Sequence, residues 1–205
     1  MFLRYHKREV QATPRGSASK IPEEIFMKTK ELTITALCCA LTAILAPMTI
    51  TLPFTLIPFS LSLIPIFLTG AILPKRHAFL AIVLYVLLGL IGLPVFSGFA
   101  SGVGVLAGPT GGFVVGYPFT ALAVAWAVEK RFSLPRYAVG AIIGMVVCYL
   151  PGSVWYAISA GVPYGQALLA TVVPFVLWDA LKAVLAGAVA AALRRALPRV
   201  LQPAV

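Results

Sequence analysis

The chain has 205 residues, of which 60% are hydrophobic and only 11% are charged, and its mean hydropathy is strongly positive. Water-soluble domains of this size rarely have such a composition, so the sequence indicates a membrane protein. The net charge of +10 does not indicate a nucleic-acid-binding protein, because the basic residues lie in the gaps between apolar segments instead of gathering on one face.

The first 26 residues are polar, mixed in charge, and contain Pro14, Gly16 and Pro22, which predicts a flexible N-terminal extension. No apolar segment with a small-residue cleavage site follows directly, so this region does not have the pattern of a signal peptide. Met27 begins the segment MKTKELTITALCCALTAI, which resembles a natural start. We therefore expect an extension over residues 1–26 and a single transmembrane domain over 27–205.

Six apolar segments follow, and most approach the roughly 20 residues that a helix needs to cross a bilayer. The predicted helices are Leu32–Leu52, Leu56–Leu73, Ala78–Leu93, Phe113–Val128, Tyr137–Ser159 and Ala167–Leu193. The first two are expected to be kinked or broken by Pro47, Pro53, Pro58 and Pro65. The predicted fold class is an all-α membrane protein with six transmembrane helices and a long glycine-rich loop, residues 94–112, between the third and fourth helices.

Lys and Arg residues lie almost entirely on one side of this predicted bundle. All but one precede the first helix, follow the last, or lie in the connections between the second and third and between the fourth and fifth helices. The connections 53–55, 94–112 and 160–166 contain none. By the positive-inside rule, both termini are expected in the cytoplasm and the loop 94–112 outside a multi-pass protein of the cell (plasma) membrane.

Lys182 is the exception, and Asp179, three residues earlier, is the only acid inside a predicted helix. Each ionised side chain costs about 2.5 to 3.5 kcal/mol at the centre of a membrane helix, so we expect both to face the protein interior. Asp179 lies about 22 Å from Arg194 along the helix, in the outer half of the bilayer. The two residues either form a self-neutralising internal ion pair or bind a small polar ligand.

The uncharged segment GLPVFSGFASGVGVLAGPTGGFVVGYPFTA, residues 92–121, is rich in glycine. It lacks the lysine and strand of a Walker A motif and the βαβ setting of a Rossmann fingerprint. We expect it to fold back over a cavity, where backbone N–H groups contact a ligand.

Tyr149 is expected to supply an aromatic wall, unless the aromatic residues around it form only an interfacial belt. The candidate ligand contacts besides Asp179 and Lys182 are Phe96, Ser97, Gly111, Tyr117, Trp155 and Tyr156.

Two predicted helices carry stripes of small residues, which let helices approach closely. The first predicted helix has Ala36 and Ala40, and the last has Ala183, Gly187 and Ala191. The pair Ala36 and Ala40 is a candidate docking face for another membrane protein, although internal packing explains such stripes equally well.

The predicted membrane region offers no catalytic set, since it contains one acid and no histidine and lacks an HExxH motif. Cys38, Cys39 and Cys148 lie in apolar segments without metal-ligand spacing, so neither a metal nor a disulfide is expected. The sequence therefore predicts a protein that is not an enzyme. A binding subunit and a proton-coupled carrier that works alone both remain possible.

The segment GLPVFSGFASGVGVLAGPTGGFVVGY, with VWY at residues 154–156 and PFVLWDALKA at 174–183, resembles the biotin-specific substrate-binding (S) components of energy-coupling-factor (ECF) transporters, the BioY family. The resemblance extends from Met27 to the end, and its most specific features are the G-P-T-G-G stretch at 108–112 and the D-x-x-K of Asp179 and Lys182. It implies a six-helix, high-affinity biotin-binding subunit of an ATP-driven vitamin transporter, with biotin as transported ligand and no cofactor.

The resemblance also implies partners, namely a transmembrane coupling component and two cytosolic ABC-type ATPases, with Ala36 and Ala40 in the contact face of the first helix. It places the acid and lysine of the family on Asp179 and Lys182. The ureido ring of biotin has two N–H donors for Asp179 and a carbonyl for Lys182. The carboxylate at the other end of biotin would also pair well with the ammonium group of Lys182, so the orientation of biotin stays open. An S component for thiamine or riboflavin, or a stand-alone secondary carrier, are the alternatives.

Overall fold

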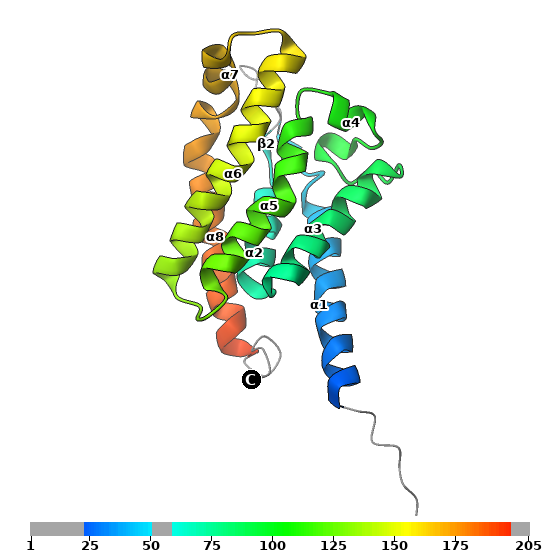
Figure 1. Ribbon diagram of the computed structural model, residues 1–205, viewed down its shortest axis with the longest axis vertical. Helices are drawn as coiled ribbons and strands as arrows, with labels where there is room; N and C mark the ends of the chain where they lie inside the picture. The colour runs from blue at the N-terminus through cyan, green and yellow to red at the C-terminus, as the bar shows by residue number, and fades with distance from the viewer. Residues whose placement is uncertain (1–22, 51–58, 198–205) are drawn as a thin grey trace, which may run out of the picture.

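The structure, a computed structural model, describes residues 23–50 and 59–197, with side chains described from Thr29 onward. Its long helices are α1 (Glu23–Leu45), α3 (Lys75–Leu90), α5 (Gly111–Val128), α6 (Leu134–Ala160) and α8 (Val173–Ala196) (Figure 1). The helices α1, α3, α5 and α8 pack around the shorter α2 (Leu63–Ile72). The smaller elements are the strands β1 (Thr49–Ile50) and β2 (Phe59–Ser60), the 3-10 helix η1 (Ser97–Phe99), and the helices α4 (Gly104–Ala107) and α7 (Tyr164–Thr171). The described residues thus form a mostly helical bundle.

Among the described residues, α5, α6 and α8 are long and apolar enough to cross a membrane. Their outward faces carry large exposed apolar side chains, such as Trp126 on α5, Ile142 on α6 and Leu177 on α8. A surface of this kind is unfavourable in water and suits contact with lipid. Length, composition and exposed surface together make this a membrane protein.

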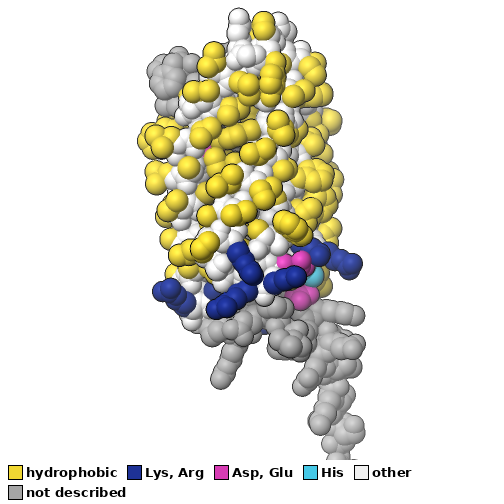
Figure 2. Space-filling view, turned by 60° about the vertical axis from the view of Figure 1, so that its left-hand side comes forward, with side chains coloured by type: hydrophobic (Ala, Val, Ile, Leu, Met, Phe, Trp, Pro, Cys, Tyr) yellow, Lys and Arg dark blue, Asp and Glu magenta, His cyan; other side chains and the backbone are white. Residues whose placement is uncertain are grey.

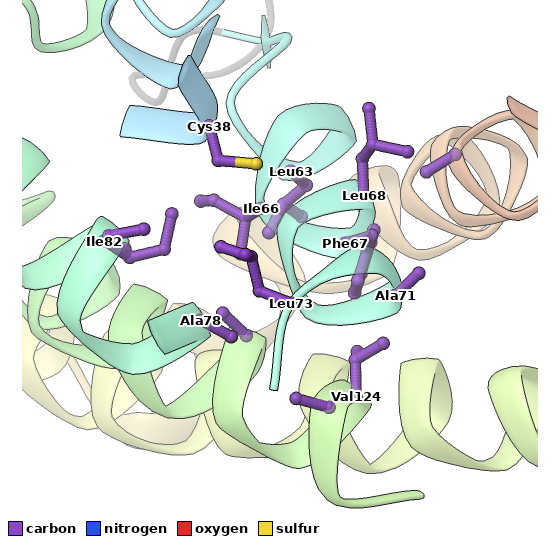
Figure 3. Close-up of a cluster of buried hydrophobic side chains, with 14 of the residues drawn as sticks. Cys38, Leu63, Ile66, Phe67, Leu68, Ala71, Leu73, Ala78, Ile82 and Val124 are labelled. Carbon is purple, nitrogen blue, oxygen red and sulfur yellow. The ribbon is translucent and has the colours of Figure 1, made fainter. Parts of the chain in front are cut away.

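The short helix α2 is the buried centre of the bundle. At 1.5 Å per residue its 10 residues reach about 15 Å, which is half of the hydrocarbon thickness. Ile66 and Phe67 are fully buried, and α2 packs among Cys38 of α1, Ile82 of α3 and Val124 of α5 (Figure 3). Since apolar residues surround the axis of α2 on all sides, its sequence suits a helix enclosed by others.

Small residues allow α5 and α6 to pack closely. A Cβ atom added to Gly144 of α6 would lie 3.1 Å from Cγ2 of Thr120 on α5. The Thr120 hydroxyl lies 3.1 Å from the Gly144 carbonyl oxygen, to which it donates across the helix interface. Interfaces of this kind are typical of membrane helices. The contact fixes the relative positions of Tyr117 on α5 and Tyr149 on α6, both of which reach the cavity described below.

The predictions for the first two helices, Leu32–Leu52 and Leu56–Leu73, are wrong where these segments meet. The helix α1 ends at Leu45, and Thr49 and Ile50 form a strand that pairs antiparallel with Phe59 and Ser60. Pro47 explains the end of α1, because proline lacks a backbone N–H and clashes with the preceding helical turn. The helix α2 begins only at Leu63, and residues 51–58 lie outside the described part of the chain.

The last predicted helix, Ala167–Leu193, is in fact two helices. The break between α7 and α8 lies at Val172, whose φ and ψ angles are −115° and −56°. Pro174 accounts for the break, since a proline fits the first turn of a helix but cannot continue the preceding one.

The remaining helix predictions agree with the structure to within about one turn. Phe113–Val128 and Tyr137–Ser159 correspond to α5 and α6, and Ala78–Leu93 corresponds to α3, which ends at Leu90 before Gly92 adopts a φ of +109°. The helix α1 begins at Glu23, four residues before Met27. The division into an extension, 1–26, and a domain, 27–205, stays a prediction, because residues 1–22 are outside the described part of the chain.

Candidate ligand-binding site

A cavity of about 320 Å³ lies between the helices and the connection from α3 to α5. Helix side chains that line it include Tyr85, Tyr117, Tyr149, Phe175, Asp179 and Lys182. The connection contributes Phe96, Ser97, Val105, Gly108, Pro109 and Thr110, and Ser60 of β2 and Ser62 just before α2 also line the cavity. The cavity is therefore largely apolar and aromatic with a few polar groups, which is the usual character of a small-molecule site.

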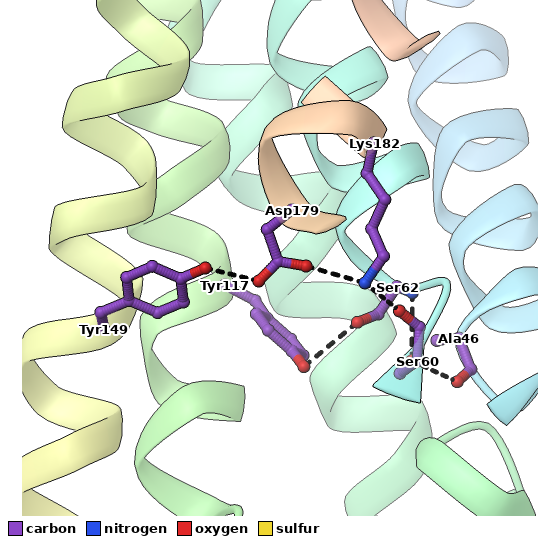
Figure 4. Close-up of polar contacts among 7 residues, drawn as sticks. All are labelled: Ala46, Ser60, Ser62, Tyr117, Tyr149, Asp179 and Lys182. Atoms are coloured by element: carbon purple, nitrogen blue, oxygen red, sulfur yellow. Dashed lines mark hydrogen bonds and ion pairs between the residues drawn. The ribbon is translucent and has the colours of Figure 1, made fainter. Parts of the chain in front are cut away.

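Asp179 and Lys182 lie on the same face of α8 and form an ion pair inside this cavity (Figure 4). The Lys182 Nζ atom is 2.8 Å from Oδ1 of Asp179, and the two residues are 6% and 4% exposed, respectively. Neither side chain faces lipid. Asp179 and Lys182 neutralise one another, but because a cavity adjoins the ion pair, both groups can also contact a ligand.

Other parts of the fold hold both members of the ion pair. The Tyr149 hydroxyl on α6 donates to Oδ2 of Asp179 at 2.6 Å, and Lys182 donates to the backbone carbonyl of Ser60 at 2.6 Å (Figure 4). The Lys182 Nζ atom also lies 3.9 Å from the centre of the Phe59 ring, within the range of a cation–π contact. The ammonium group of Lys182 thus already has three partners, namely Asp179, the Ser60 carbonyl and the Phe59 ring. Each Asp179 oxygen, by contrast, keeps a lone pair that can accept from a further donor.

Tyr117 and Ser62 add a second pair of hydroxyl groups to the same cavity. Ser62 donates to the Tyr117 hydroxyl at 3.2 Å (Figure 4). Among the described residues, the structure gives no acceptor for the hydrogen of Tyr117 itself. This phenol can therefore donate to a ligand carbonyl that approaches the ion pair.

Phe96 fixes the first part of the connection between α3 and α5. Its ring is 1% exposed and meets the Tyr85 ring edge-on, with 5.8 Å between the ring centres. A Cβ atom on Gly89 would collide with the Phe96 ring, so the glycine makes room for it. The Tyr85 hydroxyl donates to the Val95 carbonyl at 3.1 Å. Phe96 thus forms a rigid apolar wall of the cavity.

The structure brings five of the eight candidate contacts together around the cavity. Asp179, Lys182, Phe96, Ser97 and Tyr117 all line it.

Gly111, Trp155 and Tyr156 are not among the lining residues. Gly111 follows Thr110 and lies against the backbone of Leu106, where a Cβ atom would collide. Trp155 is 40% exposed and donates from Nε1 to the Gly108 carbonyl at 3.0 Å. Tyr156 is buried, with 5% of its surface exposed. A direct contact of these three residues with a ligand stays a prediction.

Sequence reasoning missed Ser60, Ser62 and Tyr85, which also line the cavity. Tyr85 is a hydroxyl group inside an otherwise apolar helix, so its sequence context contained a usable signal. The two serines gave none, because the segment before α2 was expected to be part of the helix Leu56–Leu73.

The two stripes of small residues lie in different environments. Ala36 and Ala40 are exposed on the outward face of α1, while Cys38 and Cys39 on the same helix are buried. On α8, Ala183 and Gly187 are buried, and a Cβ atom on Gly187 would collide with the Tyr137 ring. The stripe on α8 therefore serves internal packing.

Cys38, Cys39 and Cys148 are free and buried thiols. Within residues 23–50 and 59–197, no group of three or more His, Cys, Asp and Glu side chains is placed to hold a metal ion.

Helical architecture, a lipid-facing surface and a ligand-sized cavity define an all-α membrane protein with a candidate small-molecule site. The BioY family profile matches residues 17–199, and the chain therefore belongs to the BioY family. Biotin transporter BioY2 of Lactococcus lactis is 36% identical over 172 residues, which cover 83% of this chain and 93% of that protein. Biotin transporter BioY of Thermotoga maritima is 35% identical over 147 residues, 71% of this chain and 86% of its own length.

A solved structure has the same fold. It is described as the crystal structure at 2.1 Å of the S-component for biotin from an ECF-type ABC transporter. It matches with a TM-score of 0.77 and 25% sequence identity, covering 83% of this chain and 93% of that one.

Proposed function

We propose that this chain is the biotin-binding S component of an ATP-driven ECF-type transporter. The observation that carries the proposal is the buried ion pair Asp179–Lys182, which lies beside a cavity in a membrane protein of the BioY family. The relatives and the solved structure carry biotin in their descriptions, which favours biotin over thiamine or riboflavin. A stand-alone carrier is not favoured, since the solved structure belongs to an ECF-type ABC transporter.

The chemistry of biotin matches the contents of the cavity. Asp179 offers carboxylate lone pairs to the two N–H groups of the ureido ring, and the Tyr117 phenol is a donor for the ureido carbonyl. Tyr85, Phe96 and Phe175 give the ring system and the valeryl chain an apolar and aromatic surround. The volume of about 320 Å³ lies at the lower end of the usual range for small-molecule sites, as expected for a ligand of this size.

Charge favours one orientation of biotin in the cavity. Asp179 and Lys182 neutralise one another, and the ammonium group already contacts Ser60 and the Phe59 ring. A ligand carboxylate placed there would be a second buried anion for one cation, which is unfavourable at low dielectric. The neutral ureido ring therefore lies at the ion pair, and the carboxylate lies toward Ser97 and Thr110 of the connection.

The chain crosses the plasma membrane six times, with both termini in the cytoplasm. Figure 2 supports this topology, because Lys and Arg side chains gather at one end of the molecule on the face shown. Lys75 at the start of α3 and Glu129 after α5 form an ion pair at that end, 3.0 Å apart. The positive-inside rule makes this end cytoplasmic. The connection with η1 and α4 then faces outward, and the cavity beneath it captures biotin from outside.

The partners are a transmembrane coupling component and two cytosolic ABC-type ATPases. Ala36 and Ala40 support a docking face on α1, because they are exposed there and small enough to admit a second helix. This chain only binds the ligand, and ATP hydrolysis by the partners drives uptake.

Isothermal titration calorimetry of the purified protein in lipid nanodiscs tests the proposal. Biotin should bind saturably, an excess of thiamine or riboflavin should not compete, and Asp179→Asn and Lys182→Ala should weaken binding strongly. Lys75→Ala is the matched control, since it removes an exposed ion pair far from the cavity. Unchanged affinity in both cavity variants would remove the assigned site, and a wild-type protein that does not bind biotin would overturn the function.

A further inference from the structure

Trp155 of α6 contacts the connection that covers the cavity without lining the cavity itself. Its indole N–H donates to the carbonyl oxygen of Gly108 at 3.0 Å. Gly108, Pro109 and Thr110 all line the cavity, whereas Trp155 does not. The indole therefore lies behind this wall, on the side away from the ligand.

The hydrogen bond acts on a tight turn. The Gly108 carbonyl also accepts from the Gly111 backbone N–H at 3.1 Å, which closes a four-residue turn just before α5. The same carbonyl thus holds the turn together and ties it to α6. Any movement of the turn away from α6 must break the bond to Trp155.

Glycine allows the turn and the start of α5 to lie this close to their neighbours. A Cβ atom on Gly112 would collide with the Pro151 carbonyl and with the Cβ atom of Trp155. A Cβ atom on Gly111 would collide with the backbone of Leu106. Close packing against α6 and α4 therefore explains both glycines of the G-P-T-G-G stretch.

The segment before this turn is also held by the Gly102 N–H, which donates to the Gly89 carbonyl at 2.8 Å, and by Val105 and Leu106, which pack against the core. The helix α4 has no buried residue, and Val103 is 69% exposed. Among the described residues, Trp155 supplies the one side-chain hydrogen bond that reaches residues 101–110 from another helix. Phe96, by contrast, is locked between Tyr85 and Gly89. Trp155 thus adds a side-chain hydrogen bond that ties the half of the connection nearest α5 to α6.

We propose that Trp155 is a positioning residue, which holds the wall of Gly108, Pro109 and Thr110 against the bound ligand through the Gly108 carbonyl and so limits how fast the ligand leaves. The inference rests on the proposed function, because the ligand in question is biotin. Trp155 acts through the turn and makes no contact of its own with the ligand.

Stopped-flow and dissociation measurements with biotin on Trp155→Phe test this role. Phenylalanine keeps an aromatic ring and removes the N–H donor. Loss of one neutral hydrogen bond corresponds to a dissociation rate about three- to tenfold higher, with an association rate changed by less than about twofold. Trp126→Phe is the matched control, since Trp126 is an exposed tryptophan at the far end of α5 and should leave both rates unchanged.

Hydrogen exchange of the ligand-free protein gives an independent readout. In Trp155→Phe the backbone amides of residues 104–112 should exchange faster, while the other helices and the melting temperature stay as in the wild type. A dissociation rate equal to that of the control, or faster exchange across the whole bundle, would overturn the positioning role. Wild-type protein that fails to bind biotin would instead overturn the proposed function.

Discussion

The Tyr149 hydroxyl on α6 donates a 2.6 Å hydrogen bond to Oδ2 of Asp179 on α8 (Figure 4). The carboxylate is thus held from a second helix as well as by Lys182, three residues along its own helix. Hydrogen bonds to an ionised group are short and strong, and two of them fix the plane of the carboxylate. The lone pairs that remain on the carboxylate therefore have a defined direction, which suits a group that accepts hydrogen bonds from a ligand.

Tyr149→Phe should weaken biotin binding about tenfold, because the Asp179 carboxylate loses a charge-assisted hydrogen bond that orients it. Isothermal titration calorimetry would measure the change. Tyr164→Phe is a suitable control, since this tyrosine contacts Ser153 at 3.3 Å and does not line the cavity. Equal affinity of Tyr149→Phe and the wild type would show that Asp179 needs no support from α6.

Removing one member of the ion pair should destabilise the fold more than removing both. Lys182→Met leaves a buried carboxylate without its cation, for which a loss of about 3 to 5 kcal/mol is typical. The double variant Asp179→Asn, Lys182→Met leaves no buried charge, so its melting temperature should lie above that of Lys182→Met, while neither variant should bind biotin tightly. A double variant that melts below the single variant would contradict this account.

The sequence alone predicted the parts of the fold that depend on hydrophobic length and on the cost of buried charge. Long apolar segments defined α5 and α6 to within three residues. Asp179 and Lys182 could be assigned to the interior because a charged pair at helical spacing in an apolar segment has no stable place in lipid.

The details that the sequence did not reveal depend on contacts between distant segments. The hairpin of β1 and β2 replaces predicted helix, and its Ser60 carbonyl meets Lys182, which is 122 residues away. Similarly, the hydrogen bond from the Trp155 N–H to the Gly108 carbonyl joins residues 47 positions apart. An aromatic side chain can line a cavity or pack behind the residues that line it, so the sequence alone does not distinguish these two positions for Trp155.

Leucine at two small residues should have different effects, on assembly at Ala40 and on stability at Gly187. Ala40→Leu on the exposed face of α1 should leave biotin binding and the melting temperature unchanged, but should reduce co-purification with the coupling component, because the larger side chain keeps a partner helix at a distance. Gly187→Leu should lower stability by about 1 to 3 kcal/mol, since it would collide with the buried Tyr137 ring.

Ala180→Leu is the matched control for the substitution on α1. Ala180 is exposed on α8, so a leucine there should affect neither stability nor assembly. If Ala40→Leu assembles as well as this control, the docking face lies elsewhere on the protein.

Analogues of biotin should distinguish the two ends of the ligand. With the ureido ring at the ion pair, biotin amide, which has no negative charge, should bind within about fivefold of biotin, because the carboxylate meets only neutral groups near Ser97 and Thr110. Biotin blocked at a ureido nitrogen should bind about 10- to 100-fold more weakly, since Asp179 loses a donor. Titration calorimetry with the three compounds gives both ratios.

If the carboxylate instead pairs with Lys182, the order reverses, and the amide becomes the weaker ligand because the ammonium group loses its anion. Asp179→Asn then provides the cross-check. It should reduce the difference between biotin and the ureido-blocked analogue while leaving the ratio of biotin to its amide unchanged, because only the first comparison involves the carboxylate of Asp179.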